Sequence, residues 1–485
     1  MKFMRSLSAA TVAVSGATAP NALKVSSQIS IRNVAATIAY ETMVYYKGNT
    51  TDPTSREFGN VQKPYYWWVA GALWGALLDY YHYTSDPSYN GVIIQALLAP
   101  TNLGADNYQP PEHADEEGND DLFFWGSAVL SAAERNFPQP NSELPSWLDI
   151  SDNIFNELVG RWDTQHCGGG LFWQISPDNP NGMTYKNSVS NGGFFQLSAR
   201  LARATGNKNE TYLNWAEKIW DWTAEMGILD NNTYRVYDGA SIDTNCKGVT
   251  QKSFSYTTGI FLYGAAVMTN VTGDDKWLQR TQKLLDQAGA HFFTDDKIMY
   301  EPACEPKKTC NYDMITFKGY LSRFMWQTAL MLPALRDKVD SLMIPTAQAA
   351  SSICTGGKDG RQCGMKWYTG SFDYATLGGQ MGALEAVQGL LSHGSAAPLE
   401  GNDIEWVKKA SFKPIDPYSE IASTQTSSTA VVTSTPSSTT TTSTISTTAK
   451  PSSTTKHKNV ATPTGCADNK FAGVVVAGLV AWGMT

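Results

Sequence analysis

The chain has 485 residues, of which 42% are hydrophobic, so it is long enough to bury a large core. Its formal net charge of −8, with no basic stripe in the main body, excludes a general binder of phosphate backbones, and we expect no nucleic-acid partner. Many of its 15 Trp and 22 Tyr residues occur in clusters. Such clusters suit either the flat C–H faces of a carbohydrate ligand or the edge of a large core.

The N-terminus resembles a secretory signal peptide, because Lys2 and Arg5 precede a short apolar stretch and several small residues. We place this signal at residues 1–19. Acceptor sites for N-linked glycans, of the form Asn-x-Ser/Thr, fit a secreted chain and occur at Asn49, Asn209, Asn231 and Asn270.

The main body, residues 28–400, is predicted to be helical almost throughout, with few convincing strands. Helices that are apolar almost all round alternate with amphipathic ones, a pattern that indicates two helical layers. About twelve helices are predicted from hydrophobic periodicity, over 31–46, 67–83, 89–98, 119–135, 147–160, 187–204, 210–226, 255–268, 275–291, 317–335, 337–350 and 375–391.

A repeated turn joins the two helices of a pair. It has the form Thr-Gly/Ser-Asp/Asn, and an aromatic residue then opens the second helix. Gly suits the end of one helix and Asp or Asn the start of the next. Six such hairpins closing on themselves predict an (α/α)₆ toroid with the apolar helices inside. An open α-solenoid is the alternative, but the even helix count and the absence of capping repeats favour closure.

Long connections between the predicted helices are expected to build a cleft at one rim of the toroid, at 99–118, 161–186, 227–252 and 290–316. By proximity in sequence we expect the disulfides Cys304–Cys310 and Cys354–Cys363, which leaves Cys167 to pair with Cys246, although six cysteines permit 15 pairings. His166 and Cys167 are adjacent, but no second ligand pair at a recognised spacing accompanies them. We therefore expect no metal and no cofactor.

The C-terminal region has the composition of an anchored stalk. Residues 421–464 are mostly Ser and Thr with scattered Pro, as in O-glycosylated stalks that cannot bury a core. The apolar tail that ends the chain is too short for a comfortable transmembrane helix, and it resembles a signal for attachment of a GPI (glycosylphosphatidylinositol) anchor. The attachment residue is then Asn459 or Gly465, with 460–485 as the removed segment; attachment at Asn459 also removes Cys466 and leaves an even cysteine set. We expect a secreted protein anchored to the outer face of the plasma membrane or the cell wall.

Asp120 and Asp121 stand at the start of a predicted helix, with Leu122 and an aromatic wall behind them. Helix capping alone could explain the pair, with Asn119 or Asp120 as the N-cap residue. Paired carboxylates at the mouth of a helical barrel also suit glycoside hydrolysis or transfer, in which one attacks or stabilises the sugar and the other exchanges a proton.

Two other enzyme classes fit less well. Terpenoid cyclases use further acids within the next helical turn, and here Leu122-Phe123-Phe124 follow the pair. A Ser/His/Asp hydrolase would show a Gly-x-Ser-x-Gly turn on a strand, and the sequence contains neither that motif nor an alternating sheet pattern.

Several motifs spread over residues 30–395 resemble the endo-α-1,6-mannanases of glycoside hydrolase family seventy-six, and in particular the fungal Dfg5/Dcw1 branch. The matching motifs are Pro64-Tyr65-Tyr66-Trp67-Trp68 with Ala70-Gly71-Ala72, Asn119-Asp120-Asp121, Lys186-Asn187 with Ser190-Asn191-Gly192, Phe254-Ser255-Tyr256 and Phe317-Lys318-Gly319.

This resemblance implies the (α/α)₆ fold and a retaining mechanism on α-1,6-linked mannose, with Asp120 as nucleophile and Asp121 as acid/base. For the fungal branch it implies action on the mannose-bearing GPI glycan, linking anchored proteins to wall glucan. The chain departs from many relatives at Thr257-Thr258, where they carry Asn after the tyrosine. That departure puts one sugar-binding amide in doubt, and not the acid pair.

Other candidate substrate contacts each have a structural alternative. Tyr66, Trp68 and Trp125 suit stacking on sugar, against core packing. Asn187, Asn191 and Tyr256 suit bonds to hydroxyls, against helix capping for the two asparagines. Lys318 and Arg323 suit contacts with phosphate or acidic groups, against a solvated helix face.

The sequence therefore leaves three alternative functions open. The first is an anchored glycosidase or transglycosidase acting on a mannose-containing glycan, with wall glucan as acceptor. The others are a plain endo-α-1,6-mannan hydrolase and a non-catalytic mannan-binding wall protein. We expect a monomer in each case.

Overall fold

The computed structural model describes residues 23–48, 52, 54–139, 144–177, 182–207 and 210–405. The chain divides into two compact units, Met1–Ser428 and Thr429–Thr485, and all described residues belong to the first. The predicted signal peptide, stalk and anchor signal lie outside the described residues, as do Asn49 and Asn209. Within the described part, none of the helices combines the length and the apolarity that crossing a bilayer would require.

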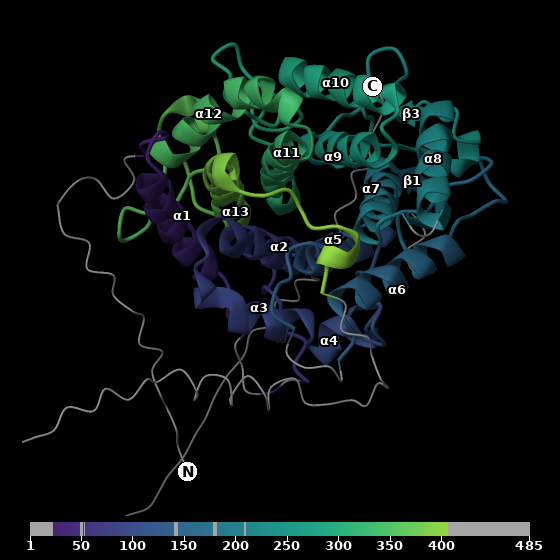
Figure 1. Ribbon diagram of the computed structural model, residues 1–485, viewed down its shortest axis with the longest axis horizontal. Helices are drawn as coiled ribbons and strands as arrows, with labels where there is room; N and C mark the ends of the chain where they lie inside the picture. Colours follow the sequence, from purple (N-terminus) through teal and green to yellow (C-terminus); the bar gives the residue numbers. More distant parts are fainter. Residues whose placement is uncertain are drawn as a thin grey trace, which may run out of the picture. The chain divides into compact units, whose positions relative to one another are not determined.

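Six helices form a closed inner ring (Figure 1), because each packs against the next and the last packs against the first. This closure confirms the predicted (α/α)₆ toroid and removes the open solenoid. The inner helices, in order around the ring, are α2 (Trp67–Thr84), α5 (Asn119–Ala133), α7 (Ser188–Ala204), α9 (Ser255–Thr272), α11 (Tyr312–Met331) and α13 (Leu377–Gln388).

An outer layer of six helices surrounds the ring (Figure 1). The N-terminal helix packs on the last inner helix, so the two ends of the helical body complete one hairpin. The outer helices are α1 (Gln28–Met43), α3 (Asn90–Leu97), α6 (Trp147–Gly160), α8 (Glu210–Glu225), α10 (Asp275–His291) and α12 (Arg336–Ser352). Shorter helical pieces lie in the connections, namely α4 (Pro100–Leu103) and the 3₁₀ turns Pro87–Tyr89, Pro111–His113, Gly182–Thr184, Ile242–Thr244, Pro333–Leu335, Trp367–Thr369, Gly389–Gly394 and Gly401–Asp403.

The two layers differ in burial as their sequences predict. All 17 residues of the inner helix α7 are buried. The outer helix α10 instead buries one stripe at helical spacing, made of Trp277, Thr281, Leu284, Leu285 and Ala288. A stripe of this kind faces the core while the opposite face stays in water.

Small residues let neighbouring inner helices approach closely. A Cβ atom added at Gly319 of α11 would lie 3.0 Å from the Cα atom of Gly382 on α13. The obstruction is backbone, so it cannot give way by rotating a side chain. Glycine at position 319 therefore allows the close spacing of this part of the ring.

The predicted hairpin turn is confirmed in its chemistry. Ser85 and Gly273 end α2 and α9 in the left-handed conformation, with φ of 60° and 65°. Asp86 and Asp274 then accept hydrogen bonds from the N–H groups of Ser88 and Lys276, which opens the following helical segment. These side chains satisfy N–H groups that have no partner within the helix.

Two of the long connections contain a small antiparallel sheet that hydrophobic alternation did not reveal. Its strands are β1 (Tyr185–Asn187), β2 (Gly239–Ser241) and β3 (Val249–Thr250), in that spatial order, with Lys186 opposite Ala240. The three predicted disulfides are formed, Cys167–Cys246, Cys304–Cys310 and Cys354–Cys363. The first of them joins the segment before β1 to the β2–β3 connection.

Candidate active site

The start of α5 is fixed from outside the helix. The Asn119 N–H donates to the Trp173 carbonyl at 2.9 Å, and its side-chain amide donates to the Phe172 carbonyl at 2.8 Å. Gly118 also pairs with Gln174 as an isolated antiparallel bridge. The segment that follows the glycine run thus holds the first turn of the helix in place.

The N-cap residue of α5 is Gly118, so the expectation of Asn119 or Asp120 in that position was wrong. Asp121 lies three residues on, and its Oδ2 accepts the Gly118 N–H at 2.8 Å. This bond turns the Asp121 carboxyl back over the helix end, as in one half of a capping box.

The two acids occupy different environments. Asp121 is buried, with 6% of its surface exposed, whereas Asp120 is partly exposed. Asp120 Oδ1 accepts the Asp121 backbone N–H at 3.2 Å, and its carboxylate also accepts a hydrogen bond from the Trp173 side chain. Asp120 therefore has donors that favour a negative charge, besides the positive end of the helix.

These surroundings separate the two pKa values. Burial raises the pKa of Asp120 to about 6, while a hydrogen bond with the Asp121 side chain, and then the N–H donors around Asp120, oppose a larger shift. Burial together with the neighbouring charge of Asp120 raises the pKa of Asp121 well above its usual range. Asp121 therefore holds its proton to higher pH than Asp120 does, and Asp120 is the carboxyl that ionises first. One ionised and one protonated carboxyl is the arrangement that retaining glycosidases require.

A second aromatic cluster, made of Tyr256, Phe317, Phe124 and Trp68 and called the wall from here on, lies next to the pair. Tyr256, near the start of α9, stacks on Phe317 of α11 with ring centroids 3.8 Å apart and planes 9° apart. Phe124 of α5 lies behind Tyr256, and Trp68 of α2 lies 4.6 Å from Phe124. Burial, and then the charges of Asp238, Asp120 and Asp313, raise the pKa of the Tyr256 hydroxyl. Its ring therefore lies close to the nucleophile candidate.

Sequence reasoning missed Trp173 and two further acids near this wall. Asp313, in the first turn of α11, accepts the Trp68 indole N–H at 3.1 Å, and burial raises its pKa to about 6. Asp238 accepts the Tyr185 hydroxyl at 2.8 Å, and burial raises its pKa as well. None of these residues belongs to a local motif. Trp173 reaches Asp120 from the connection between α6 and β1, and Asp238 and Asp313 act on the Tyr256 hydroxyl as Asp120 does.

The aromatic candidates divide between surface and core. Tyr66 is 40% exposed, with the Lys63 ammonium 4.6 Å from its ring centroid. Trp68 is 9% exposed and belongs to the wall. Trp125 is fully buried and packs against the rings of Trp67 and Tyr108. It supports the helix from behind and cannot stack on a sugar in this position.

The two asparagine candidates are used by the protein itself. Asn187 caps α7, because its side chain accepts the Ser190 N–H at 3.0 Å. Asn191 is fully buried and exchanges hydrogen bonds with both backbone groups of Leu171. The helix-capping alternative therefore describes Asn187, and Asn191 anchors the neighbouring loop. At Thr257 and Thr258, where many relatives carry Asn after the tyrosine, both hydroxyls donate to the Phe254 carbonyl.

Lys318 is neither a surface residue nor a contact for phosphate, which corrects both interpretations of it. It is 1% exposed, and its ammonium donates to Glu305 Oε1 at 2.6 Å and to the Met365 carbonyl.

Arg323 is likewise interior, and it pairs with Glu385 at 2.6 Å and with Asp79 at 3.2 Å. The sequence could not reveal this burial, because the partners come from α13 and α2, far along the chain.

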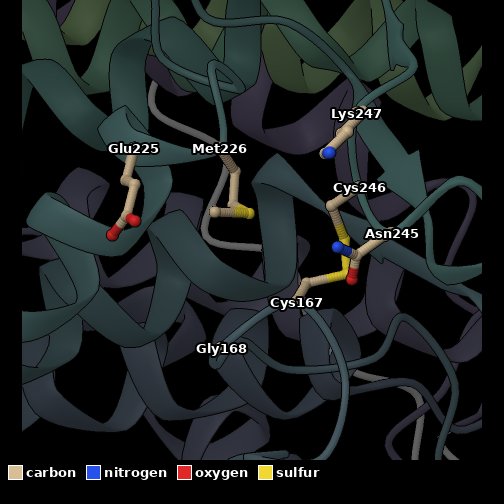
Figure 2. A pocket seen from close by; sticks show the side chains of 7 residues that line it. All are labelled: Cys167, Gly168, Glu225, Met226, Asn245, Cys246 and Lys247. Carbon is tan, nitrogen blue, oxygen red and sulfur yellow. A yellow bond between two sulfur atoms is a disulfide. The ribbon is translucent and has the colours of Figure 1, made fainter.

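A pocket of about 480 Å³ is lined by residues other than the acid pair, and Figure 2 shows the side chains around it. It is lined by the Cys167–Cys246 disulfide and neighbouring residues, namely Gly168, Glu225, Met226, Asn245 and Lys247.

Across the described residues, no group of three or more His, Cys, Asp or Glu side chains is placed to hold a metal ion. Of the predicted glycan acceptors, Asn231 and Asn270 are exposed.

Comparison with known proteins places the helical body in one family. The sequence model of Glycosyl hydrolase family 76 matches residues 30–402. Mannan endo-1,6-alpha-mannosidase DCW1 of Saccharomyces cerevisiae is 44% identical over 361 residues, which cover 74% of this chain and 78% of that protein. Its counterpart DFG5 from the same yeast is 43% identical over 379 residues, covering 78% and 81%.

Solved structures agree with this placement. Dfg5 from Chaetomium thermophilum, crystallised with glucosamine, is 38% identical with a TM-score of 0.75, covering 79% of this chain and 95% of that one. The α-1,6-mannanase of Salegentibacter sp. shares the fold with a TM-score of 0.59 at 21% identity, covering 74% and 98%. The chain belongs to glycosyl hydrolase family 76.

Proposed function

We propose that this protein is a retaining endo-α-1,6-mannosidase whose acid pair can also transfer the cleaved glycan to a second sugar. The observation that carries the proposal is the unequal environment of the pair: Asp121 is buried and turned back onto the Gly118 N–H, whereas Asp120 is partly exposed and accepts N–H donors, so that Asp120 ionises first. The names of the relatives, mannan endo-1,6-alpha-mannosidases at 43–44% identity, supply the substrate class.

The reaction follows from the two roles. The Asp120 carboxylate attacks the anomeric carbon as Asp121 gives its proton to the departing glycosidic oxygen, so that a glycosyl ester forms and the leaving sugar departs with the proton. Asp121, now ionised, then takes a proton from the incoming hydroxyl, which attacks the same carbon and releases Asp120. Both steps use the same two carboxyls, and water or a sugar hydroxyl can serve as the incoming group.

For the natural substrate we propose the mannose-bearing glycan of a GPI anchor, with wall glucan as acceptor. The secretion signal, stalk and anchor signal in the sequence support a location at the plasma membrane or wall. The glucosamine bound to the relative from Chaetomium supports a glycan that contains an amino sugar. Asp313 and Asp238 support it too, because both act electrostatically on the Tyr256 hydroxyl of the aromatic wall, and carboxylates there suit an ammonium group.

Product analysis tests this proposal. A defined α-1,6-mannose-containing GPI glycan is incubated with the protein, with and without a glucan oligosaccharide. We expect retention of the α configuration in the first product and, with glucan present, a glycan–glucan conjugate. Free reducing sugar alone, even with glucan present, would identify a plain hydrolase. Asp120→Asn and Asp121→Asn should each lose activity while still folding, and normal activity in either would refute the mechanism.

A further inference from the structure

Helix α9, which carries Tyr256, does not cap its own N-terminus, since its N-cap residue Phe254 offers no side-chain acceptor. Glu301, from the connection between α10 and α11, takes that place. Its Oε2 accepts the Ser255 backbone N–H at 3.0 Å and the Ser255 hydroxyl at 2.5 Å. Glu301 is fully buried. An acceptor for a first-turn N–H fixes where the helix begins, because that group has no partner within the helix.

The same glutamate is tied to helix α11. Its backbone N–H donates to Glu305 Oε1 at 3.0 Å, and that oxygen also accepts the Lys318 ammonium at 2.6 Å. Lys318 in turn donates to the Met365 carbonyl. The side chains of Glu301, Glu305 and Lys318 are all at most 1% exposed, and burial raises the pKa of Glu301 to about 8. One buried network therefore connects the first turn of α9 with the first half of α11.

The two ends of this network are sequence neighbours of the two stacked rings in the wall. Tyr256 follows Ser255, and Phe317 precedes Lys318. The rings are stacked at 3.8 Å and nearly parallel, so a small shift of either helix start would separate them. Each ring therefore belongs to a residue that is the direct chain neighbour of a residue in the network.

We propose that Glu301 is a positioning residue, which holds the Tyr256–Phe317 wall in the geometry that binds the sugar beside Asp120. This inference rests on the proposed function for the nature of the ligand. It also assigns the buried Lys318 of the family-like motif a role: its ammonium holds the Glu305 carboxyl, which in turn holds the backbone N–H of Glu301. Glu301 touches no reacting atom in this arrangement, so its effect reaches the substrate through Tyr256.

The test compares Glu301→Ala, which removes the acceptor, with Glu301→Gln, which keeps one. Ser255→Ala provides a milder perturbation that removes only the hydroxyl bond. For α-1,6-mannotriose we expect Glu301→Ala to raise KM about fivefold, the change in an equilibrium constant that loss of one helix cap produces, with kcat within about twofold. Glu301→Gln should restore KM, and Ser255→Ala should raise it less.

Ser146→Ala is the matched control, because it removes the N-cap of the outer helix α6, where Ser146 accepts the Asp149 N–H. It should lower stability by a similar amount and leave KM unchanged. A second measurement combines Glu301→Ala with Tyr256→Ala. If Glu301 acts through the ring, its effect on KM should vanish in the Tyr256→Ala background. Additive effects, or an equal rise in KM for Ser146→Ala, would overturn the inference.

A crystal structure of Glu301→Ala separates this inference from the proposed function. If the wild-type protein does not cleave α-1,6-mannotriose, the proposed function fails, and the structure still decides the positioning role. We expect the start of α9 to shift and the Tyr256 ring to leave its parallel stack on Phe317. An unchanged stack would refute the positioning role, whatever the activity.

Discussion

Replacing Trp173 by phenylalanine should move the acidic limb of the pH–activity profile to higher pH. The side chain of Trp173 donates to the Asp120 carboxylate, and Asp120 must be ionised to act as nucleophile. A hydrogen bond to a charged group contributes about 1.5–3 kcal/mol, and one pKa unit corresponds to about 1.4 kcal/mol. Since Trp173 is partly exposed, water replaces much of the lost donor. The expected rise in the pKa of Asp120 is therefore about half a unit to one unit.

The direction of this shift follows from the ionisation state in which Asp120 is active. Loss of the donor destabilises the ionised carboxylate, so Asp120 stays protonated to higher pH and activity falls on the acidic side. The assay is kcat/KM on reducing-end-labelled α-1,6-mannooligosaccharides across the range from about pH 4 to pH 8, which spans the Asp120 titration. Trp222→Phe is the matched control, because the Trp222 N–H donates to the Cys167 carbonyl in the same loop. An unmoved limb, or an equal shift in Trp222→Phe, would refute the assigned role of Trp173.

Two further predictions concern stability. Arg200 of α7 pairs in the interior with Glu134, at the end of α5, at 2.7 Å. Arg200→Met leaves a buried carboxylate unpaired and should lower the unfolding free energy by about 3–5 kcal/mol in urea titrations. Arg200→Met combined with Glu134→Leu should cost less, and equal losses would contradict this account. Gly319→Ala should lower stability by about 1–3 kcal/mol, measured by thermal unfolding, because its Cβ would meet the backbone of Gly382. Gly160→Ala, at a position with open space, is the control and should show no such loss.

The helical body could be predicted because local signals and the global fold agree in it. Apolar periodicity indicated inner and outer helices, and the left-handed turns at Ser85 and Gly273 matched the residues that favour them. Boundaries failed where a cap lay outside the hydrophobic pattern. Helix α11 begins at Tyr312 and not at residue 317, because Asn311 accepts the Met314 N–H and starts the helix early. The strands escaped detection because two or three residues cannot show an alternation.

At the site, the adjacent acids could be predicted and most of their neighbours could not. Asp120 and Asp121 carry a local signal, being two carboxylates at a helix start. Trp173 and Asp313 carry none, because Trp173 reaches Asp120 from the connection after α6 and Asp313 comes near Tyr256 from α11, both far from the pair in sequence. Arg323 misled sequence reasoning for the same reason, since a cation in a helix suggests solvent until its buried partner is known.

The two ends of the inner helices serve separate purposes, and this separation makes the chemistry testable apart from the fold. The site draws on the first turns of α5, α9 and α11, where positive helix ends favour the ionised Asp120. Deeper in the ring, buried cations and carboxylates join the helices across it, as Arg135 does with Asp79 and Arg200 with Glu134. Substitutions at the first end should therefore change KM, kcat or the pH profile and cost less stability than substitutions at the ion pairs. Substitutions at these ion pairs should chiefly lower stability, because the pairs join the helices to one another.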